Sequence, residues 1–155
     1  MDIARIGPGD WERFRAVRLA SLSDSPAAFG SRYEDWLDAS EERWRSRLTE
    51  VPLTLIAHDG VEVVGVVSGQ SEGECWAEMI SMWVDPSARG TGAADDLITA
   101  TVGWAAGQGR STYLMVRSDN ARARAAYERA GFVDRGVPDG WPIDEPPERR
   151  MEMRL

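Results

Sequence analysis

Hydrophobic and polar positions in the first part of the chain change from strand-like to helix-like spacing. Residues 2–6 alternate as in a short strand, and apolar positions then recur three and four residues apart, as on one face of a helix. The predicted elements are a strand over 2–6, a helix over 11–22, an ambiguous aromatic stretch over 27–38 and a second helix ending near Leu48. Asp10 and Asp38 are expected to cap the two helices, because a side-chain oxygen there accepts from the first helical N–H groups.

The spacing becomes that of strands from about residue 51 onward. Asp59-Gly60 lies between two apolar runs and is typical of a hairpin turn. The predicted elements are strands over 53–58, 61–68 and 76–84, a helix over 92–107, a strand over 112–116, a helix ending at Gly131, a strand starting at Phe132 and a closing strand over 151–155. Ser118 or Asp119 is expected to cap the second of these helices, and residues 136–148 are expected to form a loop.

This order predicts one α/β (α+β) domain over residues 1–155, with a mixed sheet and helices on its faces. Residues 1–50 supply a strand and two helices, and residues 51–155 supply the rest. Since a helix connects strands 76–84 and 112–116, these two strands are expected to be parallel. Ligands of such sheets bind at the carboxyl ends of the strands.

The charge balance and the rare residue types exclude several classes of function. The net charge of −8 argues against sequence-independent binding of nucleic acid, which needs Lys and Arg for the phosphates. The chain has one Cys and one His, so we expect neither an intrachain disulfide nor a Cys/His metal site. No apolar run is long enough to cross a bilayer and the N-terminus does not resemble a signal peptide, so a cytoplasmic location and no membrane partner are expected.

A strand ending at Asp85-Pro86 is followed by a short glycine loop, Arg89-Gly90-Thr91-Gly92, and then at once by a helix. Backbone N–H groups, the positive end of the helix dipole and one guanidinium converge there, which suits a diphosphate. A plain turn from strand to helix that needs two glycines is the alternative. A dinucleotide fingerprint fits poorly because Asp95 occupies the place of the third glycine, and a Walker A loop is excluded because the chain has no Lys.

A second motif lies on the helix that ends at Gly131. Asn120, Ala123, Arg124 and Tyr127 share one face of this helix, at positions i, i+3, i+4 and i+7. A small residue between an amide and a phenol forms a groove with two hydrogen-bonding ends. Alternatively, Tyr127 packs in the core and Asn120 is a cap residue.

Together the two motifs resemble the GNAT family of N-acetyltransferases. The acyl-CoA loop of that family, Gln/Arg-x-x-Gly-x-Gly/Ala, corresponds to 89–94 here, and its Asn followed seven residues later by Tyr and then Gly-Phe corresponds to Asn120, Tyr127 and Gly131-Phe132. The resemblance implies the GNAT fold, with a mostly antiparallel sheet of about seven strands and about four helices. It extends over about 50–155.

The resemblance also implies a cofactor site for acetyl-CoA, with no metal. Backbone groups of 82–84 would pair with the pantetheine arm, those of 90–94 and the Arg89 side chain would hold the diphosphate, and Tyr127 would reach the sulfur. The expected cofactor-binding residues are Met82, Trp83, Val84, Arg89, Gly90, Thr91, Gly92, Ala93, Ala94, Asn120, Arg124 and Tyr127. Asp95 and Asp96, in the first helical turn, are expected to face away from the diphosphate.

Acetyl transfer to an amine needs a base for the ammonium and an acid for the departing thiolate. Glu78 is the candidate base, because strand alternation would place it on the same face as Met82. Tyr127 is the candidate acid, since a phenol with a pKa near ~10 can protonate a thiolate with a pKa near ~8.5. A Glu on the outer, solvated face of a strand is the alternative for Glu78.

Two hypotheses for the function follow. The first is an acyl-CoA-dependent N-acetyltransferase that acts on a small-molecule or peptide amine by direct attack in a ternary complex, with a homodimer as one option for its assembly. The second is a GNAT-like sensor or interaction module that binds acyl-CoA with little turnover. The resemblance implies that the first two helices and the loop 136–148 shape the acceptor site.

Overall fold

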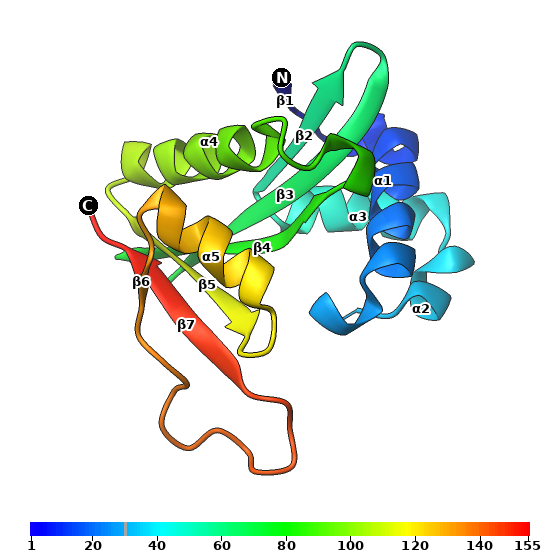
Figure 1. The fold of residues 1–155 in the computed structure, drawn as a ribbon. Coiled ribbons are helices and arrows are strands. Elements are labelled where there is room, and N and C mark those ends of the chain that lie inside the picture. Colours follow the sequence, from blue (N-terminus) through cyan, green and yellow to red (C-terminus); the bar gives the residue numbers. More distant parts are fainter. Residues whose placement is uncertain (30) are drawn as a thin grey trace.

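Seven strands form one mixed sheet in the order β1-β2-β3-β4-β5-β7-β6 (Figure 1). The structure is a computed structural model and describes residues 1–29 and 31–155. The strands are β1 (Asp2–Arg5), β2 (Leu53–Asp59), β3 (Glu62–Glu72), β4 (Trp76–Val84), β5 (Ser111–Arg117), β6 (Val133–Asp134) and β7 (Glu148–Met153). Only β4 and β5 pair in parallel, as predicted for the two strands that a helix connects; the other described pairings are antiparallel.

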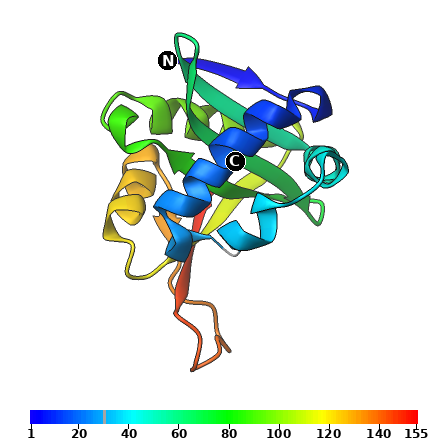
Figure 2. The ribbon, with the colours of Figure 1, turned by 90° about the vertical axis from the view of Figure 1, so that its right-hand side faces the viewer.

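Helices cover both faces of this sheet (Figures 1 and 2). The helices are α1 (Trp11–Asp24), α2 (Tyr33–Leu37), α3 (Glu41–Glu50), α4 (Ala93–Gly107) and α5 (Ala121–Ala130), with short 3-10 turns at η1 (Pro8–Asp10), η2 (Pro26–Ala28) and η3 (Pro86–Ala88). Leu97 and Ile98 of α4 pack on one face of the sheet, and Phe14 of α1 and Trp44 of α3 pack on the other. The expected fold class is therefore confirmed.

The cores on the two faces differ in character. The face under α4 is aliphatic, with Leu55, Val67 and Leu114 beneath Leu97. On the other face the Phe14 and Trp44 rings meet edge to face, with centroids 5.8 Å apart. Burial of such side chains contributes about 1.5–3 kcal/mol each, so both layers are held firmly to the sheet.

A wedge opens between β4 and β5. They pair at only three positions, of which Glu78 opposite Tyr113 is the last, and the remainders of both strands diverge. Helix α4, which connects the two strands and is longer than α5, covers the aliphatic face of the sheet. Helix α5 lies beside the open end of the wedge (Figure 1). A ligand can therefore reach the backbone of β4 beyond Glu78 on its β5 side.

A bulge in β4 changes the direction of its side chains. Ser81 has a left-handed backbone conformation (φ 59°), and the pairing with β3 shifts at the same level. An extra residue in a strand moves all later side chains to the opposite face. Met79 and Val84 consequently lie in the same core cluster. In a regular strand, side chains separated by an odd number of positions, such as these five, would lie on opposite faces.

The bulge makes one prediction from the sequence wrong. Met82 packs with Met79 on the α4 face, whereas Glu78, the neighbour of Met79, points to the α1 face beside Tyr113. The uniform alternation assumed for residues 76–84 does not hold, because it stops at Ser81.

Three predicted caps are also wrong in detail. Ser40, not Asp38, caps α3 by accepting from the Arg43 N–H, and Asn120, not Ser118 or Asp119, caps α5. Asp10 does precede α1, but its carboxylate accepts from the Gly7 N–H instead of a helical one. For α3 and α5 another oxygen nearby is the better placed acceptor, whereas Asp10 occupies the expected cap position and only its hydrogen bond differs.

Two strands are longer or earlier than predicted. β3 continues past residue 68, its predicted end, to Glu72, because the residues up to Glu72 also pair with β4 and the chain turns around Gly73. β7 begins at Glu148, inside the stretch predicted as a loop. The remaining loop between β6 and β7 projects away from the body in both views (Figures 1 and 2). No helix in the described part of the chain has the length and apolarity to cross a membrane.

Candidate functional site

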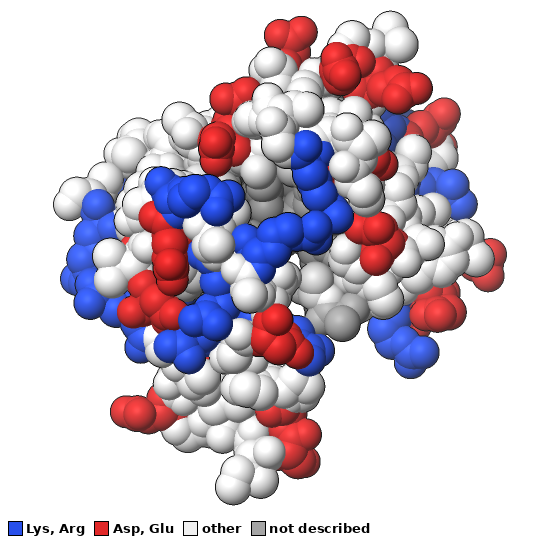
Figure 3. Space-filling model, viewed as in Figure 1, with Lys and Arg blue, Asp and Glu red and all other residues white. Residues whose placement is uncertain are grey.

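A cavity of about 330 Å³ lies at the open end of the wedge. Met82 and Val84 of β4 form one wall, Ala123 and Tyr127 of α5 form the opposite one, and Phe29 closes the side toward α1. On the face shown in Figure 3, arginine side chains gather around a hollow beside α5. Arg89, Arg122 and Arg129 are the arginines that line the cavity.

The loop before α4 forms an open cradle at one end of this cavity. Gly90 (φ 81°) and Gly92 (φ 90°) both have left-handed conformations that other residues adopt only with strain. A Cβ built on either would meet no atom within 4 Å, so their outer faces are free for a ligand. In the described part of the chain no acceptor bonds the N–H groups of Gly90 and Gly92, and the first N–H groups of α4 lack intrahelical partners. The cradle thus presents several donors and a helix N-terminus to one point.

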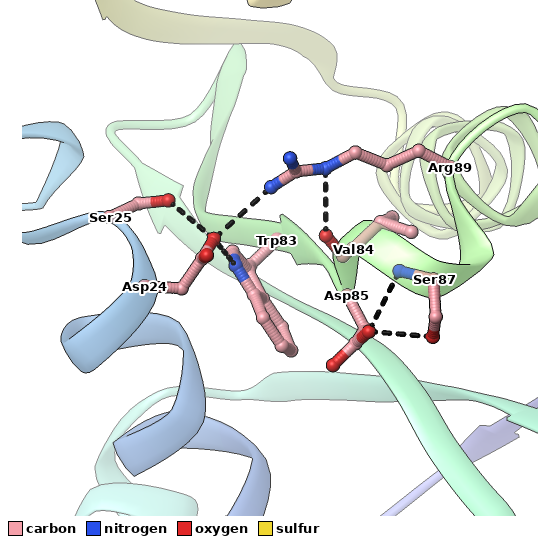
Figure 4. A network of polar contacts seen from close by, with 7 residues as sticks. All are labelled: Asp24, Ser25, Trp83, Val84, Asp85, Ser87 and Arg89. Carbon is pink, nitrogen blue, oxygen red and sulfur yellow. Dashed lines mark hydrogen bonds and ion pairs between the residues drawn. The ribbon is translucent and has the colours of Figure 1, made fainter.

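Arg89 is held in place at the edge of the cradle (Figure 4). Its Nε donates to the Val84 carbonyl at 3.2 Å, and its Nη2 lies 3.1 Å from Oδ2 of Asp24, at the end of α1. The same carboxylate oxygen accepts from Trp83 Nε1 at 3.0 Å and from Ser25 Oγ at 2.9 Å. The Trp83 and Ser25 hydrogen bonds, with the nearby Arg89 charge, lower the pKa of Asp24.

A second carboxylate shapes the turn that leads into the cradle (Figure 4). Asp85 Oδ1 accepts from the Ser87 hydroxyl at 2.6 Å and from the Ser87 N–H at 2.9 Å. These bonds lower the pKa of Asp85 and begin the 3-10 turn η3. Asp85 is therefore a structural residue of the loop, and the side chain that reaches the cavity is Arg89.

The α5 wall combines a cap with a phenol. Asn120 lines the cavity, and its Oδ1 accepts from the Ala123 N–H at 3.2 Å, so its amide nitrogen has no partner among the described residues. Tyr127 borders the cavity and packs edge-on against Phe132, with centroids 5.9 Å apart. Burial raises the pKa of Tyr127, so the phenol keeps its proton well into the alkaline range. The two interpretations of the α5 motif, a ligand groove and a cap with a packed tyrosine, thus both hold in part, because Asn120 caps the helix and also lines the cavity.

Most of the residues expected at the cofactor site meet at this cavity. Those lining it are Met82, Trp83, Val84, Arg89, Gly90, Gly92, Ala94, Asn120 and Tyr127. Thr91 and Ala93 do not line it, since the Thr91 hydroxyl and N–H turn back to the Ala88 carbonyl and Ala93 is buried. Arg124 is turned away, because its guanidinium bonds the Ser118 carbonyl and Asp134.

Asp95 differs from the expectation for the first turn of α4. Asp95 is among the residues that line the cavity, whereas Asp96 is not. Sequence reasoning also missed Arg122 and Arg129. Their spacing with Ala126 (i, i+4, i+7) on one stripe of α5 was the available signal.

Glu78 lies at the apex of the wedge, outside the lining of this cavity. Its Oε1 accepts from Gln70 Nε2 at 3.1 Å across the β3–β4 pair. Burial, followed by the charges of Glu78 and Glu72, raises the pKa of Tyr113 to about 12. Glu78 thus occupies the α1 face of the sheet and Tyr127 the α5 side, and the wedge connects the two.

No group of three His, Cys, Asp or Glu side chains in the described part of the chain is placed to hold a metal ion. The donors around the cavity are guanidinium, amide and backbone N–H groups. Such groups bind anions rather than cations.

Comparison with known sequences gives one family. The sequence model of the acetyltransferase (GNAT) family matches residues 16–132. No curated protein sequence matches this chain.

Solved structures of similar fold include three acetyltransferases. A ribosomal-protein-alanine N-acetyltransferase from Brucella melitensis superposes with a TM-score of 0.77 at 19% identity, over 100% of both chains. A putative acetyltransferase from Salmonella typhimurium with its cofactor acetyl-CoA has a TM-score of 0.74 at 18% identity, over 100% of this chain and 94% of that one. A ribosomal L7/L12 α-N-protein acetyltransferase in complex with coenzyme A has a TM-score of 0.79 at 15% identity, over 99% of this chain and 93% of that one. At these identities the superpositions establish a shared fold.

Proposed function

This chain belongs to the acetyltransferase (GNAT) family, and from that premise we propose that it transfers an acetyl group from acetyl-CoA to a primary amine by direct attack in a ternary complex. The observation that carries the proposal is the wedge between β4 and β5, which has an anion cradle at its mouth and a candidate acid and base at its two sides. Two of the structural relatives are protein N-acetyltransferases by name, which favours an amine as the acceptor.

The charge of the cavity lining and the unpaired edge of β4 support acetyl-CoA as the ligand. The free N–H groups of Gly90 and Gly92, with Arg89, suit the diphosphate. The unpaired side of β4 beyond Glu78 suits an extended arm that adds to the strand as β-augmentation. When bound, acetyl-CoA supplies an activated acetyl thioester.

The remaining chemistry belongs to side chains of this protein. Tyr127, which keeps its proton, is the donor to the departing thiolate, and Glu78 at the apex is the acceptor of the proton from the ammonium. Holding both reactants in one wedge provides the proximity that a bimolecular reaction in solution lacks.

The test is release of free thiol from acetyl-CoA in the presence of a diverse panel of amines, including peptides with free N-termini. We expect amine-dependent release with at least one class of acceptor. Tight acetyl-CoA binding without amine-dependent release from any member of the panel would favour the alternative of a binding or sensor module.

Two further points belong to the same proposal. We treat residues 1–155 as one catalytic domain, and the single sheet that includes both β1 and β7 supports this. A cytoplasmic location and a homodimer stay predictions from the sequence.

A further inference from the structure

Two arginines lie inside the layer between α1, α3 and the sheet without an acidic partner. Arg18 of α1 is only 6% exposed, and its Nη1 has a single long contact of 3.5 Å to Ser21 Oγ. Arg47 of α3 has a buried Nη1 atom with no hydrogen-bond partner. No carboxylate in the described part of the chain lies within 4 Å of either guanidinium.

The two guanidinium groups are close enough to affect each other. Burial and, second, the charge of Arg47 lower the pKa of Arg18 to about 10, so both groups remain charged at neutral pH. Burial of a cation costs several kcal/mol unless an opposite charge compensates it. A buried cation beside a partly buried one, with no carboxylate near either, therefore leaves a local excess of positive charge.

Hydroxyl groups lie beside this charge, together with the rings of Phe29 and Phe14, whose centroids are 4.7 Å from the Arg18 and 5.5 Å from the Arg47 guanidinium carbon. Arg47 Nη2 lies 3.3 Å from Ser68 Oγ and 3.5 Å from Ser81 Oγ, and Ser68 is bonded to Thr54. Hydroxyls can donate to an anion as well as accept from a guanidinium. The set of donors matches that of an oxyanion site.

The arginines lie beside the wedge on the face to which Glu78 points. Arg18 stacks on Phe29, with the guanidinium carbon 4.7 Å from the ring centroid, and Phe29 lines the cavity. Ser81, a partner of Arg47, is the bulge residue next to Met82 of the cavity wall. The charge pair thus adjoins the acceptor end of the wedge, on the side of the sheet away from α5.

We propose that Arg18 and Arg47 form a subsite for a carboxylate on the acceptor, so that the preferred substrate is an amine that also carries a carboxylate group. This inference rests on the proposed acetyl transfer and specifies its acceptor class. A guanidinium recognises a carboxylate through two parallel N–H donors, and such charge-assisted bonds are about twice as strong as neutral ones. In the bound state the carboxylate supplies the missing counter-charge.

Arg47 also borders an outer hollow beside Glu42 and Glu50, which are exposed. Neither carboxylate forms an ion pair with it among the described residues. Arg45, on the same helix, is paired with Glu41 at the surface and therefore offers a matched control.

The experiment compares straight-chain aminocarboxylates of increasing length with n-alkylamines of the same carbon number, by thiol release and by calorimetry on the protein loaded with coenzyme A. A tripeptide that begins with glutamate, compared with its glutamine counterpart, distinguishes a peptide from a small molecule as the source of the carboxylate. We expect wild type to prefer the best aminocarboxylate by about tenfold or more in kcat/KM and in affinity. Arg47→Gln and Arg18→Gln should each abolish that preference, and Arg45→Gln should keep it.

Thermal unfolding provides a second readout. Removing a partly buried charge that no described carboxylate compensates should raise the melting temperature of the unliganded protein in Arg47→Gln, whereas a purely structural arginine would lower it. Acetyl-CoA binding by calorimetry verifies that each variant is folded. Equal affinity of wild type for the two compound series, or a preference that survives both substitutions, would overturn the inference. Arginine-dependent carboxylate binding without any turnover would instead overturn the proposed function and leave the subsite standing.

Discussion

At the scale of single residues, Asp95, which carries a carboxylate, lines a cavity that Arg89, Arg122 and Arg129 make positive. A diphosphate in the cradle would be repelled by that carboxylate, although the charge suits the start of α4. For a partly exposed pair the Coulomb energy is on the order of 1 kcal/mol. We therefore expect Asp95→Asn to tighten acetyl-CoA binding about two- to fivefold, measured by calorimetry.

Asp96→Asn is the matched control for this change. It removes the same charge from the same helical turn, but Asp96 does not line the cavity. Both variants should lose a similar few tenths of a kcal/mol from the helix dipole, and only Asp95→Asn should gain affinity. The gain should shrink in high salt, and equal affinities of the two variants would show that Asp95 does not oppose the ligand.

Tyr127 is the second residue whose environment leads to a prediction. Burial raises the pKa of its phenol above the usual value for tyrosine. The phenol therefore keeps its proton at neutral pH and in moderately alkaline solution. Tyr127→Phe keeps the packing on Phe132 and removes the proton, so kcat should fall by about a hundredfold with little change in acetyl-CoA affinity. The ratio of wild-type to variant kcat should be constant from neutral pH to about pH 9.5, because the phenol stays protonated throughout. An unchanged kcat would exclude Tyr127 as the acid.

At the scale of elements, the bulge of β4 sets the geometry of the site, and Ser81 carries its strain. A left-handed backbone at a non-glycine residue is tolerated by Ser but strongly disfavours a β-branched side chain. We expect Ser81→Val to lower the free energy of unfolding by about 1–3 kcal/mol in denaturant titrations. Ser71→Val, at a regular position of β3, should change it little. Equal effects of the two substitutions would mean that the bulge is not strained.

The same bulge marks the limit of what the sequence could predict. Element order, the parallel β4–β5 pair and the cradle followed from hydrophobic period and glycine spacing, which are local properties. The face of Glu78 relative to Met82 and the direction of Arg124 did not, because the first depends on the bulged pairing with β3 and the second on a contact with β6. The cap of α3 is local, but Asp38 and Ser40 both offer an oxygen before that helix. Arg124 is the clearest case, since Asp134 of β6 removes it from a helix face that it shares with Tyr127 by spacing alone.

At the scale of the whole molecule, two ion networks hold separate parts of the chain together. Asp24 joins the end of α1 to β4 and to the cradle through Trp83 and Arg89. Asp134 joins β6 to β7 and α5. Burial raises its pKa, but the hydrogen bonds from Arg149 and the Gly136 N–H outweigh that effect and leave the pKa lowered. Both carboxylates therefore stabilise the fold in their charged form.

The Asp24 network can be tested by its dependence on pH. The pKa of Asp24 is lower in the folded than in the unfolded chain, so its stabilisation is complete above the unfolded value, near ~4, and is lost as the pH falls through the folded value. Asp24→Asn should reduce the free energy of unfolding at neutral pH by about 1–2 kcal/mol, and the difference from wild type should vanish in acid. Asp119→Asn, at an exposed ion pair with Arg117, should have little effect at either pH. A loss in Asp24→Asn that persisted unchanged in acid would show that packing of this side chain, rather than its charge, links α1 to the cradle.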